Sequence, residues 1–325
     1  MSRARKTPIR HALTAGAALL AGVLAGSVAP ADAVDVPSLP GTPPAPSPTP
    51  SPTPAPTPAP GPEAASTDLT IASFNVLGSS HTRGHGGYAS GVRRTKGVVR
   101  LLDKHDVEVV GLQEMQADQM RSFLDRTNGR YAAFPGLGGE REIDGENSVA
   151  WDTSAWEAVQ KKSFTIPYFG GHRRAMPLVK LRNLGTGMTA WFANVHNPAT
   201  NRHHGGNDHW RRKAILREAK LARKLHDTGV PVFLTGDMNE REQAFCPITG
   251  KAPMRAARGG SHTGGRCRAG NPRYVDWAFG SKQLTFSGYV EDRGAVDRRT
   301  SDHPIVVTDA HIDGAEYQQA VQPAS

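Results

Sequence analysis

The sequence predicts an α/β domain in which β-sheets pack face to face and helices cover the outside. Many short segments have the length and apolar pattern of strands, whereas few segments have helical periodicity. One of the apolar runs, 107–112, is nearly continuous, which is typical of a strand buried on both faces. Many strands with few helices favour packed sheets with outer helices, because every apolar face has to be covered.

The elements can be assigned in chain order. A helix is expected at 93–105, where Val98, Leu101 and Leu102 recur at helical spacing. The clearest helix is 208–226, because Trp210 and Ala214 share its apolar face while most basic residues lie elsewhere. Strands are expected at 69–76, 107–112, 148–151, 178–181, 188–195, 231–235, 274–279 and 305–307. This globular part covers 67–313, and 314–325 is assigned to a C-terminal tail.

The first 33 residues have the pattern of a secretion signal. Four basic residues lie within the first ten, an uncharged apolar stretch follows at 13–28, and Ala31-Asp32-Ala33 matches a signal-peptidase site. A membrane anchor is the alternative, but the stretch is short and rich in Ala and Gly. We expect a secreted, extracellular or envelope-associated protein. Removal of the segment lowers the net charge from +9 to +6, because it carries four basic residues and one acidic residue.

Residues 34–66 are predicted to form a disordered, Pro-rich linker. Thirteen of the 25 prolines lie between Pro37 and Pro62, in near alternation with Ser, Thr or Ala. Proline lacks an amide donor, so the segment is expected to run as extended polyproline II. It could hold a catalytic domain away from the cell envelope, or it could be a protease-resistant stalk without a partner. Both interpretations remain open.

Composition excludes several other classes. The two cysteines are too few for a disulfide-framework miniprotein or a four-cysteine zinc module. The second half has no apolar run of about 20 residues, as a polytopic membrane protein would require. The positive charge favours anionic partners.

Six short strings combine a predicted strand with polar residues at its end. Acidic residues after a strand are often helix caps, but six such strings in one chain are harder to explain in that way. Their carboxylates, amides and histidines suit a hard divalent cation better than zinc. The strings are Ser73-Phe74-Asn75, Gly111-Leu112-Gln113-Glu114, Asn194-Val195-His196, Gly236-Asp237-Met238-Asn239, Val275-Asp276-Trp277 and Ser301-Asp302-His303-Pro304.

The order and spacing of these strings resemble the endonuclease/exonuclease/phosphatase superfamily, over about residues 68–312. That superfamily includes pancreatic-type deoxyribonuclease, apurinic endonucleases, sphingomyelinases and inositol-polyphosphate 5-phosphatases. The most specific strings are those around Asp237 and His303. The resemblance implies a deoxyribonuclease I-like, four-layer α/β sandwich of two packed β-sheets flanked by helices, with the site at one edge between the sheets.

The resemblance also implies a metal centre. Glu114 resembles the principal metal ligand of the family, with Asn75 beside it and Asp302 near the metal. The cofactor is expected to be Mg²⁺ or Mn²⁺, with Ca²⁺ as a further alternative. Some relatives carry an Asp two residues after the first Asn; here that position is Leu77, which argues against a second metal.

The resemblance assigns catalytic roles as well. Asp237 and Asn239 resemble the pair that positions the attacking water, and their spacing on an extended strand end would direct both side chains to one side. His303 would contact the scissile phosphate and be polarised by Asp276. Which group takes the proton of the water is left open.

Two further residues resemble the deoxyribonuclease branch. His196 matches its second histidine, and Glu146 stands where that histidine's Glu partner would be.

The implied activity is secreted, divalent-metal-dependent hydrolysis of phosphodiester bonds, most simply by a monomeric endonuclease. Phosphate contacts by basic residues supply most nonspecific affinity for nucleic acid, and Arg174 and Arg202 are candidates for such contacts. A phosphomonoesterase or a lipid phosphodiesterase of the same fold is an alternative. A noncatalytic binding domain displayed on a stalk is a further alternative, but it would be expected to lack at least one catalytic residue, and none is missing.

Cys246 and Cys267 are predicted to form a disulfide, because exported proteins rarely keep free thiols. The bond would close a loop of about 20 residues and contribute about 3 kcal/mol.

Overall fold

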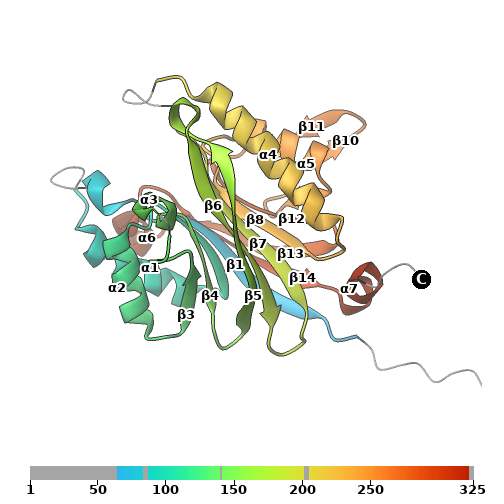
Figure 1. Ribbon diagram of the computed structural model, residues 1–325, viewed down its shortest axis with the longest axis horizontal. Coiled ribbons are helices and arrows are strands. Elements are labelled where there is room, and N and C mark those ends of the chain that lie inside the picture. Colours follow the sequence, from blue (N-terminus) through green and yellow to red (C-terminus); the bar gives the residue numbers. More distant parts are fainter. Residues whose placement is uncertain (1–63, 83–86, 140, 201–204, 322–325) are drawn as a thin grey trace, which may run out of the picture. The chain divides into compact units, whose positions relative to one another are not determined.

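The structure is a computed structural model that describes residues 64–82, 87–139, 141–200 and 205–321 (Figure 1). The predicted secretion signal and nearly all of the predicted linker lie outside the described residues, as does Arg202. Within the described residues, two six-stranded sheets form the centre, and a separate two-stranded hairpin is present. This arrangement confirms the predicted α/β sandwich.

The first sheet has the strand order β13-β14-β1-β2-β4-β3. Its pairings are antiparallel except for β1 with β2, which run parallel. The strands are β1 (Thr67–Asn75), β2 (Val109–Gln113), β3 (Tyr131–Phe134), β4 (Ser148–Asp152), β13 (Leu284–Asp292) and β14 (Ile305–Ile312).

The second sheet has the order β5-β6-β7-β8-β12-β9, with β7 and β8 parallel. Its strands are β5 (Trp156–Pro167), β6 (Arg173–Asn183), β7 (Thr189–His196), β8 (Val232–Asp237), β9 (Met254–Ala256) and β12 (Asp276–Ser281). The separate hairpin consists of β10 (Ser261–Thr263) and β11 (Arg266–Arg268).

Helices cover the outer face of each sheet (Figure 1). On the first sheet, apolar residues of α1 and α2 pack on the outward-facing side chains, such as Phe74 and Leu112. On the second sheet, α4 and α5 pack on outward-facing residues such as Val195 and Leu234. The helices are α1 (Gly91–Lys104), α2 (Ala117–Thr127), α3 (Glu142–Gly145), α4 (Asp208–His226), α5 (Glu242–Lys251), α6 (Ala295–Thr300) and α7 (Gly314–Val321), with 3₁₀ turns η1 (Ser79–Thr82) and η2 (Phe169–Gly171).

The inner faces of the two sheets form a third core. Side chains of β1 alternate between the two faces of the sheet. Ile71 belongs to the core between the sheets, whereas Ala72 and Phe74 belong to the core beneath α1 and α2. On the inner face of the second sheet, the rings of Phe192 on β7 and Phe233 on β8 stack with their centroids 4.8 Å apart and belong to this core. A fully buried side chain of this size contributes about 2–3 kcal/mol, so this layer fixes how the sheets sit on each other.

A polar layer joins the sheets near the strand ends that carry the predicted site. The Nε2 of Gln113 donates to the Oδ1 of Asn194 at 2.6 Å, and the Nδ2 of Asn194 donates to the carbonyl of Leu112 at 2.7 Å. At Gly111 a Cβ would collide with Thr235 and Asn194 of the other sheet, so only glycine permits this approach. These hydrogen bonds are buried and hold the two sheets in register beside the site, although the Oε1 of Gln113 has no hydrogen-bond partner among the described residues.

Three further features complete the fold. Cys246 of α5 and Cys267 of β11 form the predicted disulfide, which ties the β10–β11 hairpin to the second sheet's outer layer. The segment assigned to a C-terminal tail forms α7 as far as Val321. Within the described ranges, no helix is long and apolar enough to cross a membrane.

Candidate active site

Strand register brings the predicted site residues together. In the second sheet, His196 at the end of β7 pairs with Asp237 at the end of β8, and Asp237 pairs with Asp276 at the start of β12. In the first sheet, Asn75 at the end of β1 lies opposite Gln113, directly before Glu114. The carboxyl ends of parallel neighbours meet at one edge of a sheet, so four of the six strings converge as a consequence of topology.

The string around His303 reaches the same edge because β14 pairs with β1. The hydroxyl of Ser301 donates to the backbone carbonyl of Asn75 at 2.6 Å and accepts the backbone N–H of His303 at 3.2 Å. Arg94 of α1 donates to the carbonyls of Val76 and Thr300 at 2.6 and 2.7 Å. One buried guanidinium therefore clamps the loop after β1 to the loop before β14.

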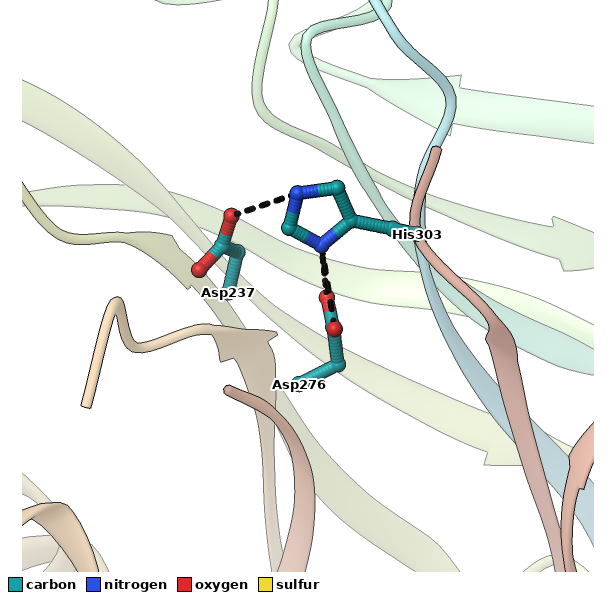
Figure 2. A group of neighbouring side chains, drawn as sticks. All are labelled: Asp237, Asp276 and His303. Atoms are coloured by element: carbon teal, nitrogen blue, oxygen red, sulfur yellow. Dashed lines mark hydrogen bonds and ion pairs between the residues drawn. The ribbon is translucent and has the colours of Figure 1, made fainter. Parts of the chain in front are cut away.

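The imidazole of His303 lies between two buried carboxylates (Figure 2). Its Nδ1 is 3.0 Å from both oxygens of Asp276, and its Nε2 is 3.7 Å from Oδ2 of Asp237. Burial by itself would lower the pKa of His303, but the charges of Asp276 and Asp237 outweigh it and raise the pKa to about 11. His303 is therefore an imidazolium at neutral pH, as its predicted role requires.

Asp237 is held by two hydrogen bonds to separate oxygens. Its Oδ1 accepts the backbone N–H of Asn239 at 2.8 Å, and its Oδ2 accepts the Nδ2 of Asn75 at 3.1 Å. Burial raises the pKa of Asp237, and the charges of His303 and His196 offset only part of that effect. A raised pKa suits a carboxylate that has to accept a proton near neutral pH.

Asn239 differs from the sequence expectation. The segment is not extended there, because Asn239 adopts a left-handed conformation with φ of 49°. Its Nδ2 donates to the carbonyl of Asn197 at 2.9 Å, while its backbone N–H binds Asp237. Asparagine tolerates this backbone conformation better than most residues, which explains its presence at the turn. In this structure Asn239 shapes the loop around Asp237 and does not present its amide parallel to that carboxylate.

Glu114 is the carboxylate on the first sheet's side of the site. It has a φ of 58°, its Oε1 accepts the Nδ2 of Asn75 at 2.9 Å, and its Oε2 accepts the backbone N–H of Gly78 at 3.0 Å. The Nδ1 of His81 is 2.7 Å from the same Oε2. Burial would raise the pKa of Glu114, but these hydrogen bonds, that of His81 foremost, hold it well below its ordinary value. Glu114 is therefore anionic throughout the neutral range.

The donor set fits a divalent cation at Glu114. The oxygens there are those of an anionic carboxylate, and exposed Asp302 is close enough for its charge to act on His81. Asn75 is turned differently from a ligand: its Oδ1 accepts the N–H of Leu77 at 3.0 Å, and its amide nitrogen links Glu114 to Asp237. A ligand role for Asn75 stays a prediction.

Asp237, Asp276 and His303 also offer donor atoms that lie within 4.8 Å of one another. We interpret this group as the catalytic cluster, because a protonated His303 hydrogen-bonded to Asp276 has no lone pair free for a metal.

The expected pairing of Glu146 with His196 is wrong. Glu146 accepts the Nη2 of Arg174 at 2.6 Å, and its other oxygen accepts the Nε2 of Gln116 at 3.2 Å. Arg174 is buried and its guanidinium lies 4.4 Å from the centre of the Tyr168 ring, so it requires an anionic partner, and Glu146 supplies it.

His196 faces the catalytic cluster instead. Its Nε2 is 3.5 Å from Oδ2 of Asp237, and within the described chain its Nδ1 has no hydrogen-bond partner. Burial lowers the pKa of His196, and the charges of Asp237 and Glu114 offset only part of the effect. The ring of Tyr168 meets it edge-on, 6.2 Å between centroids. A neutral imidazole in this place can donate or accept one proton beside Asp237.

The family model for the endonuclease/exonuclease/phosphatase family matches residues 72–303. The chain belongs to the endonuclease/exonuclease/phosphatase family. Comparison with curated proteins finds no match. Family membership and the observed sandwich confirm the recognition made from the strand-end strings.

Solved structures share this family fold at low sequence identity. A family protein from Bacteroides thetaiotaomicron has a TM-score of 0.58 at 20% identity, covering 77% of this chain and 97% of its own. A mannosyl-6-phosphatase from the same organism has a TM-score of 0.55 at 20% identity, with coverages of 74% and 99%. A D. rerio TDP2 complexed with single-strand DNA product has a TM-score of 0.53 at 15% identity, with coverages of 75% and 99%. At these identities the likeness establishes the fold alone.

Three contributions to this family site were missed from sequence. His81 was not among the predicted site residues, yet its Nδ1 lies 2.7 Å from Oε2 of Glu114. The backbone carbonyl of Asn197 accepts the Nδ2 of Asn239, and the Nδ2 of Asn197 donates to buried Glu218 at 3.3 Å. Arg94 clamps two site loops. His81 and Asn197 follow two of the strings closely in sequence, whereas Arg94 lies within α1, and its contacts with the two loops depend on tertiary structure.

Proposed function

We propose that the protein is a divalent-metal-dependent hydrolase that cleaves phosphodiester bonds in nucleic acid. The observation that carries the proposal is the imidazole of His303, held between the carboxylates of Asp276 and Asp237, with Asn75 linking Asp237 to Glu114. Within a family of phosphate-ester hydrolases, this arrangement combines a water-orienting carboxylate, a cation for the phosphate and a carboxylate for a metal.

The residues support in-line attack by water. Asp237 orients a water through its carboxylate and accepts its proton, with neutral His196 3.5 Å away as a neighbouring acceptor. The imidazolium of His303 donates from Nε2 to a phosphate oxygen and stabilises the negative charge that develops there, while Asp276 keeps the ring charged and oriented. A divalent cation bound at Glu114 with Asp302 would neutralise phosphate charge and polarise the phosphorus–oxygen bond.

Charge favours nucleic acid among the phosphate esters. The chain has a net charge of +9. Arg173 is exposed at the start of β6, and Arg241 is exposed two residues after Asn239. Exposed basic residues at strand and loop positions of the second sheet support binding to a polyanion, since phosphate contacts supply most nonspecific affinity. We further propose that the protein is exported and that the Pro-rich segment acts as a spacer, on the sequence pattern of residues 1–66.

A phosphomonoesterase is the second candidate, and the state of Arg174 favours it. From sequence, this arginine was a candidate for contacts with nucleic-acid phosphates. Its guanidinium is buried, ion-paired with Glu146 and stacked on Tyr168. A phosphomonoester has no neighbouring phosphate group, so its binding does not need a contact from Arg174.

The test compares substrates under controlled metal content. The purified protein is assayed on supercoiled plasmid DNA, single-stranded RNA, a sugar phosphate and sphingomyelin vesicles, with EDTA and then with Mg²⁺, Mn²⁺ or Ca²⁺. The expected result is cleavage of a nucleic acid that EDTA abolishes and a metal restores. Hydrolysis of the sugar phosphate alone would establish the second candidate. Full activity in a verified metal-free sample would overturn the metal-dependent mechanism, and no hydrolysis of any substrate would overturn both candidates.

A further inference from the structure

His81 approaches the carboxylate that is expected to hold the metal. Its Nδ1 lies 2.7 Å from Oε2 of Glu114, while about half of its side chain is exposed. The contact joins the 3₁₀ turn η1 to the end of β2, so it is set by tertiary structure and not by sequence neighbourhood. A half-exposed histidine whose ring nitrogen meets a partly buried carboxylate is either an ion-pair partner of that carboxylate or a second donor to the same cation.

The turn that carries His81 is held at several points. The backbone N–H groups of Ser79 and Ser80 donate to the side-chain oxygens of Gln119 and Gln116, at 2.9 and 2.8 Å. The Nε2 of Gln116 donates in return to the hydroxyl of Ser80 at 2.7 Å. The N–H of Gly78 binds the same Oε2 of Glu114 that His81 contacts. The position of the imidazole is therefore preorganised, as a metal ligand requires.

The spacing of the two donor atoms suits a shared cation. Adjacent ligands in an octahedral site with bonds of about 2.1 Å lie roughly 3 Å apart, close to the observed 2.7 Å. Besides Glu114, the acidic residues Glu146 and Asp302 are near enough for their charges to act on His81. Leu77, by contrast, offers no donor from its side chain and is buried.

We propose that His81 is a ligand of the divalent cation that Glu114 holds, and that its imidazole makes this site select Mn²⁺ over Mg²⁺. Mg²⁺ prefers oxygen donors, whereas first-row transition metals gain affinity from an imidazole nitrogen. The inference rests on the proposed metal site at Glu114 and adds to it a ligand and a selectivity.

The experiment measures metal binding directly in the full-length protein, apart from turnover. Mn²⁺ binding is followed by electron paramagnetic resonance, Mg²⁺ binding by competition against Mn²⁺, and nitrogen coordination by the ¹⁴N modulation of the Mn²⁺ spin echo. The variants are His81→Ala, His81→Asp and Glu114→Gln. The matched control is His311→Ala, because His311 makes an equally short 2.7 Å contact with Asp68 at the opposite end of β1.

The expected pattern differs for each variant. His81→Ala lowers Mn²⁺ affinity at least about tenfold and Mg²⁺ affinity less than about threefold, and it removes the ¹⁴N modulation. His81→Asp regains binding through oxygen but loses the preference for Mn²⁺. His311→Ala behaves as the unmodified protein.

Two results for His81→Ala would overturn the proposal. Unchanged Mn²⁺ affinity would show that His81 does not bind the metal, and raised affinity would show that it competes with the metal as an ion-pair partner. Glu114→Gln separates this inference from the function it rests on. If that variant binds Mn²⁺ as tightly as the unmodified protein, the metal site at Glu114 is itself wrong.

Discussion

Replacement of Asp276 by Asn tests the charge relationship on which the proposed chemistry depends. The substitution preserves the volume of a fully buried side chain and leaves an amide oxygen that can still accept the N–H of His303, but it removes the negative charge. A unit charge at the observed 3.0 Å interacts with about 5 kcal/mol at an effective dielectric constant of about 20. That energy corresponds to a roughly 5,000-fold fall in the proton affinity of the imidazole.

The sign of the pH dependence follows from this fall. In the unmodified protein the pKa of His303 is raised to about 11, so the imidazolium persists across the neutral and mildly alkaline range. Without Asp276, the pKa falls toward neutrality and the imidazolium is lost as pH rises through that range. We expect Asp276→Asn to retain most of its kcat/KM near pH 5.5 and to lose about tenfold per pH unit above neutrality.

Two measurements check the prediction. The pH profile of kcat/KM from pH 5 to 10 reports the reaction, and an NMR titration of the His303 ring reports its protonation without turnover. Asp292→Asn is the matched control, because Asp292 is another buried carboxylate that is hydrogen-bonded to a histidine. Its Oδ2 lies 2.9 Å from the Nε2 of His105. An unchanged alkaline limb together with an unchanged His303 titration in Asp276→Asn would refute the electrostatic argument.

Three other changes have defined outcomes. His303→Ala should lower the single-turnover rate about 100-fold or more, because its contact with the phosphate is made mainly in the transition state, and it should also lower the melting temperature, because it leaves the buried carboxylate of Asp276 without its cation; an unaltered single-turnover rate of the folded protein would exclude the catalytic role. Glu218→Gln should raise the free energy of unfolding by up to about 5 kcal/mol above pH 8 and hardly at pH 4.5. Burial raises the pKa of Glu218 in the folded protein from 4.5 to about 8, so ionisation of Glu218 lowers the free energy of unfolding as pH rises between these values. If Glu218→Gln changed the free energy of unfolding equally at both pH values in chemical denaturation, the prediction would be contradicted. Reduction of the Cys246–Cys267 disulfide should lower the free energy of unfolding by about 3 kcal/mol, measured by chemical denaturation with and without reductant. An unchanged denaturation midpoint would show that the disulfide does not stabilise the protein by constraining the unfolded chain.

Sequence periodicity predicted the interior of the fold better than its edges. The bounds of α4 were predicted correctly, because one face of that helix is buried against the second sheet. Strands β5 and β13, both at sheet edges, were missed. Most of their residues are exposed or only partly buried, so their composition carries little apolar signal and pairing with the neighbouring strand gives them their structure.

The same distinction applies to the site. Asn75, Asp237 and Asp276 were predictable because they end or begin buried strands, and strand register then aligns them. The partner of Glu146 could not be predicted from sequence, because the ion pair depends on the position of buried Arg174 in the folded structure. Asn239 was placed on an extended strand end, but a left-handed turn redirects its side chain. Residues whose role depends on loop conformation leave no periodic trace in sequence.

The charges of the site explain why a cation belongs in it. Glu114 is held in its anionic form, Asp276 lies against the imidazolium of His303, and exposed Asp302 adds another acidic group. A phosphate ester brings further negative charge, and one imidazolium cannot offset both the carboxylates and the substrate. Asp237 and Asp276 are each only 1% exposed, so water screens their charges poorly. A divalent cation at Glu114 would offset this imbalance where the substrate has to bind, so the charges of the side chains support the metal dependence that we propose.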